Sequence, residues 1–243
     1  MFNLFPRKVH LPESGIFNGM TDCHSHLLPG VDDGVSRMEE SLEILDKMES
    51  LGVRKVWLTP HVMEDIPNTT LSLLTRFRLL KTTYSGTIRL ALAAEYMLDN
   101  LFEERLETDD WLPLCEKGRL YLLVETSCYS PPMNLLSTLD RIRAKGCFPL
   151  LAHAERYRYM DMSDYRALKK EGISFQLNLS SLAGMYGKPV QEKAESLLKA
   201  GMYDLVGSDT HSSEYLNALL RARIDSRSMD KLSVCSRACR DVP

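Results

Sequence analysis

The chain has 243 residues, of which 44% are hydrophobic, and its formal net charge is -3 at pH 7. This length and hydrophobic content suffice for one sizeable core and predict one main domain. The weakly negative charge excludes the basic surface that nucleic-acid binding needs, so we expect no nucleic-acid partner. No apolar run approaches the roughly 18 residues of a membrane span, and we therefore expect no membrane insertion.

The six cysteines lie far apart in the sequence, without paired Cys-x-x-Cys spacing. This pattern suggests neither a disulfide framework nor a thiolate zinc site. No cysteine has an arginine six residues later, which the Cys-x5-Arg loop of thiol-dependent phosphatases requires. We therefore expect a cytoplasmic protein without a thiol mechanism.

The chain begins with a segment, residues 1–19, that contains two prolines and two glycines and is expected to form an irregular N-terminal arm. Seven short apolar runs follow, each behind a glycine or basic turn signal and before a polar loop. The predicted strands cover residues 20–23, 53–59, 88–93, 120–124, 148–152, 174–178 and 204–206.

Helical patterns fill the intervals between these strands. The clearest begins at Ser36, whose hydroxyl is expected to cap the helix while Glu39 completes a capping box, and it ends before Gly52. Alternating strands and helices predict a parallel sheet, most simply a closed or distorted barrel over residues 20–220. Residues 221–243 lack clean apolar periodicity and are expected to form an atypical, poorly ordered tail.

Histidine and acidic residues follow the ends of the predicted strands, where α/β barrels hold their chemistry. His24 and His26 alternate with Ser25 on an extended segment, so both imidazoles point to one side and can share a metal ion. Such a pair also arises by chance. His10 is the one histidine away from a predicted strand end, and we expect it to be exposed to solvent.

Acidic residues complete the candidate ligand set. Asp32 and Asp33 lie before the first predicted helix. Their negative charges could interact favourably with the N-terminus of that helix, or one of them could supply a carboxylate ligand to divalent cations. Glu95 and Glu125 follow apolar strands, where an unpaired carboxylate carries a large desolvation cost unless it meets a cation. The Asp-x-His segment that begins at Asp209 offers one oxygen and one nitrogen ligand. This inventory can hold two or three divalent ions.

Together, these motifs resemble the PHP (polymerase and histidinol phosphatase) superfamily, and within it the bacterial manganese-dependent tyrosine phosphatases of capsule and exopolysaccharide operons. The resemblance rests on DCHSHLLPGVDDG (22–34), TPH (59–61), AE (94–95), LVE (123–125), LAHAERY (151–157), SLAGMYG (181–187) and SDTH (208–211). Six of these motifs, in this order, form a highly specific combination, and SLAGMYG adds a stretch typical of the subgroup.

The resemblance implies an α/β fold, a distorted seven-stranded (β/α)7 barrel, with a trinuclear metal site. The implied ligands are His24, His26, Asp33, His61, Glu95, Glu125, His153, Asp209 and His211. Glu125 would bridge two ions, and the planar guanidinium of Arg156 would bind phosphate. A surface salt bridge between Arg156 and Glu155 is the alternative. Manganese is the expected metal, with iron, zinc or magnesium as alternatives.

The chain departs from the resembled phosphatases after its Asp-x-His motif, where a second arginine usually follows. Residues 212–216 are instead Ser-Ser-Glu-Tyr-Leu. Arg221 or Arg223 would replace that arginine only if the following helix presented it to the site. The usual C-terminal pattern is also not evident after Leu220.

The resemblance implies hydrolysis of phosphotyrosine on a protein, expected to be the tail of a bacterial tyrosine autokinase. A metal-activated hydroxide would attack phosphorus while Arg156 neutralises the phosphoryl oxygens. The phenol leaving group, with a pKa of ~10, favours phosphotyrosine over phosphoserine. The alternatives are a phosphatase of a small metabolite such as histidinol phosphate, or a non-catalytic, metal-stabilised binding module. The oligomeric state is open.

Overall fold

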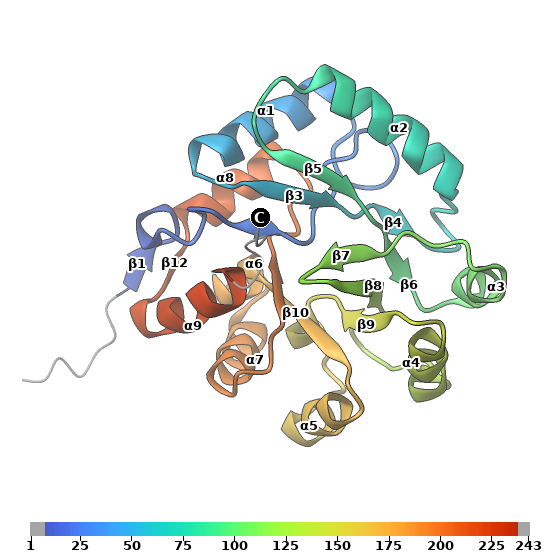
Figure 1. Ribbon diagram of the computed structural model, residues 1–243. Helices are drawn as coiled ribbons and strands as arrows, with labels where there is room; N and C mark the ends of the chain where they lie inside the picture. Colours follow the sequence, from blue (N-terminus) through green and yellow to red (C-terminus); the bar gives the residue numbers. More distant parts are fainter. Residues whose placement is uncertain (1–7, 238–243) are drawn as a thin grey trace, which may run out of the picture.

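The computed structural model describes residues 8–237, and its centre is a set of short, mostly parallel strands with helices outside them (Figure 1). One sheet contains, in spatial order, β2 (Thr21–Asp22), β3 (Lys55–Leu58) and β5 (Arg89–Leu92). A second contains β4 (His61–Val62), β6 (Glu95–Met97), β8 (Arg119–Glu125), β9 (Phe148–Leu151), β10 (Ser174–Asn178) and β11 (Leu205–Gly207). The short β7 (Leu114–Glu116) pairs antiparallel with β8.

Every predicted strand coincides with one of these elements. The strand pairs β3–β4 and β5–β6 are each separated by two residues, so the second sheet begins where the first ends. The first and last parallel strands also meet. The Cys23 amide, after β2, donates to the Val206 carbonyl of β11 at 3.1 Å, and Ser25 forms a parallel bridge with Thr210. The result is an α/β fold with a curled parallel sheet.

The residues of β8 show how the sheet is buried on both faces. Tyr121 and Leu123 belong to an inner apolar cluster, whereas Leu122 and Val124 belong to the larger core beneath the helices. Alternate side chains of a strand point to opposite faces, so an apolar run of this kind fits a sheet covered on both sides.

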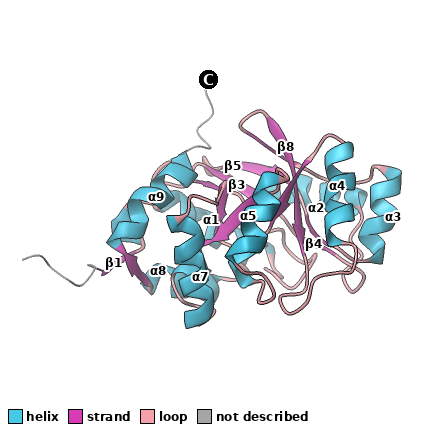
Figure 2. Ribbon diagram, turned by 90° about the horizontal axis from the view of Figure 1, so that it is seen from below, coloured by secondary structure: helices cyan, strands magenta, loops and turns pink. Residues whose placement is uncertain are grey.

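The helices surround this sheet (Figure 2). They are α1 (Met38–Ser50), α2 (Thr70–Thr83), α3 (Asn100–Thr108), α4 (Leu135–Ala144), α5 (Met162–Lys170), α6 (Leu179–Leu182), α7 (Lys188–Lys199) and α8 (Ser213–Arg221). None of the helices within residues 8–237 combines the length and apolar character needed to cross a membrane.

The start of α1 differs from the sequence-based prediction. The N-cap residue is Arg37, which makes no side-chain capping bond, so the expected capping box of Ser36 and Glu39 was wrong. The chain is still extended at Arg37, with ψ of 145°, and the N-cap therefore lies one residue later than the motif suggested. The expected end is confirmed, since Gly52 adopts a positive φ of 97° just after the helix.

The two ends of the described chain pair with each other. β1 (Lys8–His10) runs antiparallel to β12 (Arg223–Asp225), and α9 (Ser226–Arg237) follows with Leu232 fully buried. The segment from residue 221, expected to be poorly ordered, therefore forms a strand and a helix up to residue 237. Residues 1–7 of the expected arm and residues 238–243 lie outside the described part.

His10 also differs from its prediction. It is half-buried rather than exposed, and its Nε2 accepts a hydrogen bond from Arg223 Nε at 3.0 Å. A contact between two residues so far apart in the sequence cannot be predicted from the local pattern of hydrophobic residues.

Candidate metal centre

The nine candidate ligands all converge at one end of the curled sheet. They come from the C-terminal ends of strands or from the segments that immediately follow, except for Asp33, which lies in the loop before α1. The ligand atoms form three overlapping groups, each with all its atoms within 4.8 Å of one another. The groups are His26, Asp33, His61 and His211; His24, His26 and Asp209; and His61, Glu95 and Glu125. The grouping leaves out His153, which contacts the cluster through Glu95.

Glu95 lies at the middle of the cluster and is fully buried. Its Oε2 is 3.1 Å from His24 Nε2 and 3.2 Å from His61 Nδ1. Its Oε1 is 3.0 Å from His153 Nε2. Asp209 Oδ1 lies 3.4 Å from the Nε2 atoms of both His24 and His26. Each carboxylate therefore has imidazole nitrogens on more than one side.

Two buried atoms at the edge of this cluster lack hydrogen bonds. His61 Nδ1 and Glu125 Oε1 are 3.1 Å apart, yet neither has a hydrogen-bond partner. The short distance alone does not make a bond, because hydrogen bonds also require alignment. Buried polar atoms without a partner are rare and costly. A cation that accepts lone pairs from both atoms would satisfy them, so the donor set fits divalent metal.

Polar residues behind the histidines fix the orientation of the rings. His26 Nδ1 donates to Asp32 Oδ2 at 2.8 Å, and the same oxygen accepts the His61 amide at 3.0 Å. Asp32 Oδ1 accepts the Gly34 amide, so this carboxylate supports the ligand loop rather than the N-terminus of α1. On the other side, Gln176 Oε1 lies 3.1 Å from His24 Nδ1. Such partners leave Nε2 free to face a metal.

Backbone geometry at the site is unusual in two ways. His153 and Asp209 have positive φ angles, 33° and 56°, which non-glycine residues adopt only where the surrounding structure holds them. Gly207 allows close approach, because an added Cβ would lie 2.4 Å from the Cβ of His24. Neither feature is visible in the spacing of the motifs.

The electrostatics of the cluster favour positive charge. Burial lowers the pKa of His24, but Glu95 and Asp209 outweigh it and raise that pKa to about 9. Burial raises the pKa of Glu95, but His24 and His61 hold it well below its ordinary value. The carboxylates thus keep the proton on His24 at neutral pH, whereas burial and the neighbouring His26 lower the pKa of His211. Metal ions would compete for the same nitrogens.

The cluster opens into a pocket of about 370 Å³. It is lined by Asp33, His61, Met63, Glu95, Glu125, His153, Arg156, Tyr186, Asp209, His211 and Tyr215. Arg156 reaches into it, with Nη1 3.5 Å from Asp209 Oδ2 and the guanidinium over the Tyr186 ring at 4.6 Å. The alternative salt bridge with Glu155 is not found, because that carboxylate is buried and accepts the Tyr203 hydroxyl instead.

The second arginine considered from the sequence is supplied neither by Arg221, at the end of α8, nor by Arg223, in β12. Neither Arg221 nor Arg223 lines the pocket, and Arg223 instead contacts His10. Sequence reasoning did not identify Gln176 and Asp32 as supports or Tyr215 as a lining residue. Tyr186 belongs to a motif that was noted, but without a role.

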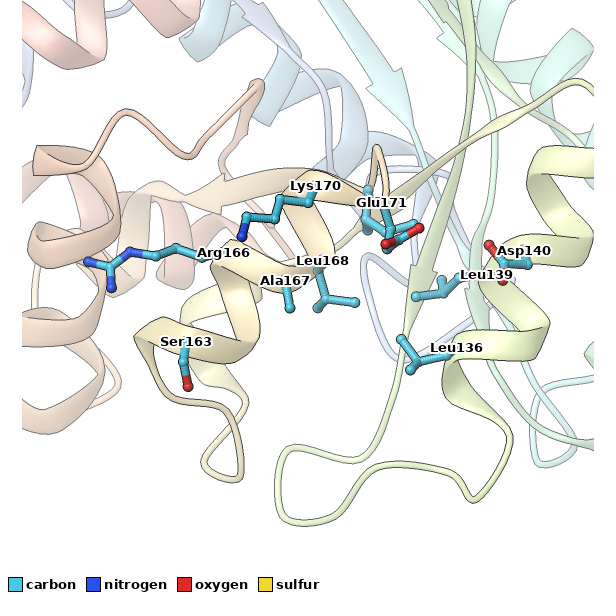
Figure 3. A pocket seen from close by; sticks show the side chains of 10 residues that line it. Leu136, Leu139, Asp140, Ser163, Arg166, Ala167, Leu168, Lys170 and Glu171 are labelled. Carbon is cyan, nitrogen blue, oxygen red and sulfur yellow. The ribbon is translucent and has the colours of Figure 1, made fainter.

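A larger hollow of about 530 Å³ lies between α4 and α5 (Figure 3). Leu136 and Leu139 line one side, and Ala167 and Leu168 line the other. None of the nine candidate ligands contributes to it. Its lining also includes the charged residues Asp140, Arg166, Lys170 and Glu171 but no histidine, so it does not offer the ligand set of the cluster.

A curled parallel sheet with histidines and carboxylates gathered at the strand ends is typical of metal-dependent hydrolases. The chain belongs to the CpsB/CapC family of capsular polysaccharide synthesis, whose family model matches residues 20–225. The resemblance recognised from the motifs is thereby confirmed.

Relatives and solved structures agree with this membership. The chain is 27% identical over 206 residues to the tyrosine-protein phosphatase YwqE of Bacillus subtilis, covering 82% of this chain and 80% of the relative. It is 28% identical over 206 residues to the tyrosine-protein phosphatase CpsB of Streptococcus pneumoniae, with coverages of 79% and 83%.

A crystal structure from work on YwqE and CpsB, described as metal-dependent tyrosine phosphatases, is similar with a TM-score of 0.72. The identity is 24%, and the match covers 88% of this chain and 85% of that chain. A histidinol phosphate phosphatase from Lactococcus lactis has a TM-score of 0.51 at 15% identity, with coverages of 90% and 94%. Both likenesses show the fold.

Proposed function

We propose that this protein is a metal-dependent protein-tyrosine phosphatase of capsule or exopolysaccharide synthesis. The observation that carries the proposal is the pair of buried, unpartnered atoms His61 Nδ1 and Glu125 Oε1 within a convergent set of histidines and carboxylates. Family membership and the phosphatase activity named for two relatives support the same conclusion.

Two or three divalent ions are held by the nine ligands, His24, His26, Asp33, His61, Glu95, Glu125, His153, Asp209 and His211. Three overlapping groups of ligand atoms support this number. Manganese is the metal we expect, with iron, zinc or magnesium as alternatives. Glu125 would hold metal together with His61 and His153, whose nitrogens lie 3.1 and 3.6 Å from its two carboxylate oxygens. Bound divalent ions supply Lewis acidity and lower the pKa of water.

Arg156 binds the phosphoryl group. Its side chain is mostly buried at the pocket wall, and its nearest carboxylate contact, with Asp209, is long at 3.5 Å. The guanidinium is therefore only loosely engaged and can turn its planar fork to two phosphate oxygens. Stacking on Tyr186 limits its motion, which reduces the entropy lost when a phosphate binds.

The substrate is phosphotyrosine on a protein, and the tail of a bacterial tyrosine autokinase is the expected partner in the cytoplasm. The pocket volume of about 370 Å³ lies within the usual range for ligand sites. A phenolate leaving group needs only modest proton donation because its pKa is ~10. An extended protein segment can reach the pocket because its lining residues Asp33, His211 and Tyr215 are not fully buried.

We also infer that the parallel strands form a distorted seven-stranded barrel. Counting β3 with β4 and β5 with β6 gives seven strand positions from β2 to β11. The hydrogen bond from Cys23 to Val206 and the bridge between Ser25 and Thr210 support closure between the first and last.

The test is turnover of a phosphotyrosine peptide by protein loaded with manganese, compared with phosphoserine peptide and histidinol phosphate. We expect the highest kcat/KM on the phosphotyrosine peptide. Preference for histidinol phosphate would instead indicate a metabolite phosphatase. Tight metal binding without turnover of any monoester, p-nitrophenyl phosphate included, would indicate a non-catalytic binding module.

A further inference from the structure

The pocket wall divides into two kinds of residue. Seven of its eleven lining residues are candidate metal ligands, and the remaining four are Met63, Arg156, Tyr186 and Tyr215. Metal ions would bind the lone pairs of the seven candidate ligands. Arg156 and the two tyrosine hydroxyls are therefore the donors left on this wall for phosphoryl oxygens.

The two tyrosines come from different elements and meet at their hydroxyl groups. Tyr186 lies in the turn between α6 and α7, and Tyr215 lies in the first turn of α8. Their hydroxyl oxygens are 2.8 Å apart, which is a normal hydrogen bond. Ser212 caps α8 by accepting the Tyr215 amide at 3.1 Å. Because helical side chains tilt toward the N-terminus, this cap directs Tyr215 at the pocket.

The hydrogen atoms of the pair are not fully used. One hydroxyl donates to the other, which leaves a single O–H to bond elsewhere. Tyr186 reaches the carboxylate oxygen Asp209 Oδ2 only at 3.5 Å, well beyond the usual O–H···O distance. Its other polar neighbour is Asn178, and Tyr215 has Ser180 beside its hydroxyl. Asp209 Oδ2 already accepts a 2.7 Å bond from Asn178 Nδ2. The remaining tyrosine proton therefore has no short bond to a carboxylate, and an anion in the pocket would be a stronger acceptor for it.

A phosphate monoester has three terminal oxygens, and one guanidinium fork covers two of them. The segment after the Asp-x-His motif carries no second arginine, but it does carry Tyr215. A hydroxyl donor contributes no positive charge, so it does not repel cations bound at the neighbouring His211 and Asp209.

Resting on the phosphatase function above, we propose that the hydrogen-bonded pair of Tyr186 and Tyr215 binds the phosphoryl group together with Arg156. The pair donates a hydrogen bond to the oxygen that Arg156 leaves uncovered. The Tyr186 ring also holds the Arg156 guanidinium by stacking, so the phosphate contacts form one connected unit.

The experiment is titration calorimetry of inorganic phosphate into manganese-loaded protein, with metal content measured on the same samples. The variants are Tyr186→Phe, Tyr215→Phe and the double variant, which keep both rings and the stacking. The matched control is Tyr129→Phe, because Tyr129 is 70% exposed and does not line the pocket. We expect the double variant to weaken phosphate binding about 10-fold or more, since hydrogen bonds to charged groups are the stronger ones. The control should match the wild type.

Unchanged phosphate affinity in the double variant would overturn the proposal and assign the pair a purely structural role. If the double variant loses metal, the two single variants carry the same test, each with an expected loss of about 3-fold or more. Wild-type protein that hydrolyses phosphotyrosine while the variants bind phosphate normally would remove only the tyrosine proposal. Wild-type protein that neither binds phosphate nor hydrolyses phosphotyrosine would remove the proposed function as well.

Discussion

Gln176 holds His24 in place from outside the ligand cluster: its Oε1 lies 3.1 Å from His24 Nδ1. The same oxygen accepts the backbone amide of His153 at 2.8 Å. One buried amide in β10 therefore orients one candidate ligand directly and another through its backbone. The amide nitrogen of Gln176 donates to the Leu177 carbonyl, which fixes which end of the amide faces the histidines.

Replacement of Gln176 by alanine should weaken metal binding by about 10-fold to 100-fold, because the His24 ring loses the partner that fixes its tautomer and orientation. Metal competition titrations with a calibrated chelator measure this directly. Gln191→Ala is the matched control, since Gln191 lies in α7 and bonds to the Leu182 carbonyl away from the cluster. Equal metal affinity in the two variants would contradict a role for Gln176 in orienting the ligands.

Most of the predicted ligand positions follow from short-range sequence information, whereas the choice of Asp33 over Asp32 rests on the family resemblance. Six of the seven predicted strand ends are marked by an apolar run followed by a histidine or acidic residue, the strand at 174–178 being the exception, and parallel strands bring such ends to one edge. Gln176 gave no comparable signal because it lies inside a strand among apolar neighbours. Its role depends on the distance to His24, which is 152 residues away in the chain. The pairing of β1 with β12 was missed for the same reason.

Metal removal should abolish phosphatase activity, and added manganese should restore it. A thiol-dependent mechanism is best tested at Cys128, because its thiol interacts with Arg156. Burial raises the pKa of Cys128, so the thiol stays protonated at neutral pH and is a poor nucleophile. Cys128→Ser should therefore retain at least about half of the activity. Full activity in excess chelator, after metal removal is verified by mass spectrometry, would exclude the metal-dependent mechanism.

The stability of the metal-free protein should fall as the pH rises. The pKa of His24 in the folded protein is about 9, above the ordinary value of 6.5 for an unfolded chain. A raised folded-state pKa contributes stability that is complete below 6.5 and is lost as the pH rises through 9. The loss should be about 3 kcal/mol at most from this group.

Thermal melting in chelator between pH 6 and pH 9.5 measures this effect. Manganese-loaded protein is the control, and its melting temperature should depend less on pH in this window because metal replaces the proton on His24. A metal-free protein that becomes more stable with rising pH would contradict the proposed protonation of the cluster.

Arg156 should carry much of the charge recognition of phosphate, because it is the sole arginine or lysine among the residues that line the pocket. Arg156→Ala should lower kcat/KM on a phosphotyrosine peptide by about 100-fold, since a charge-assisted bidentate contact in a water-poor site is worth about 3 kcal/mol. Arg156→Lys should recover only part of this, because an ammonium restores the charge but not the planar fork.

The matched control is Arg158→Ala, in which an exposed arginine that stacks on Tyr129 outside the metal pocket is removed. Its kcat/KM should stay within about 3-fold of wild type, since exposed charges interact weakly with the site. Metal content should be unchanged in all three variants, because a guanidinium does not ligate cations. An Arg156→Ala protein with near-wild-type kcat/KM would mean that the metal ions and the tyrosine pair bind the phosphoryl group without help from the arginine.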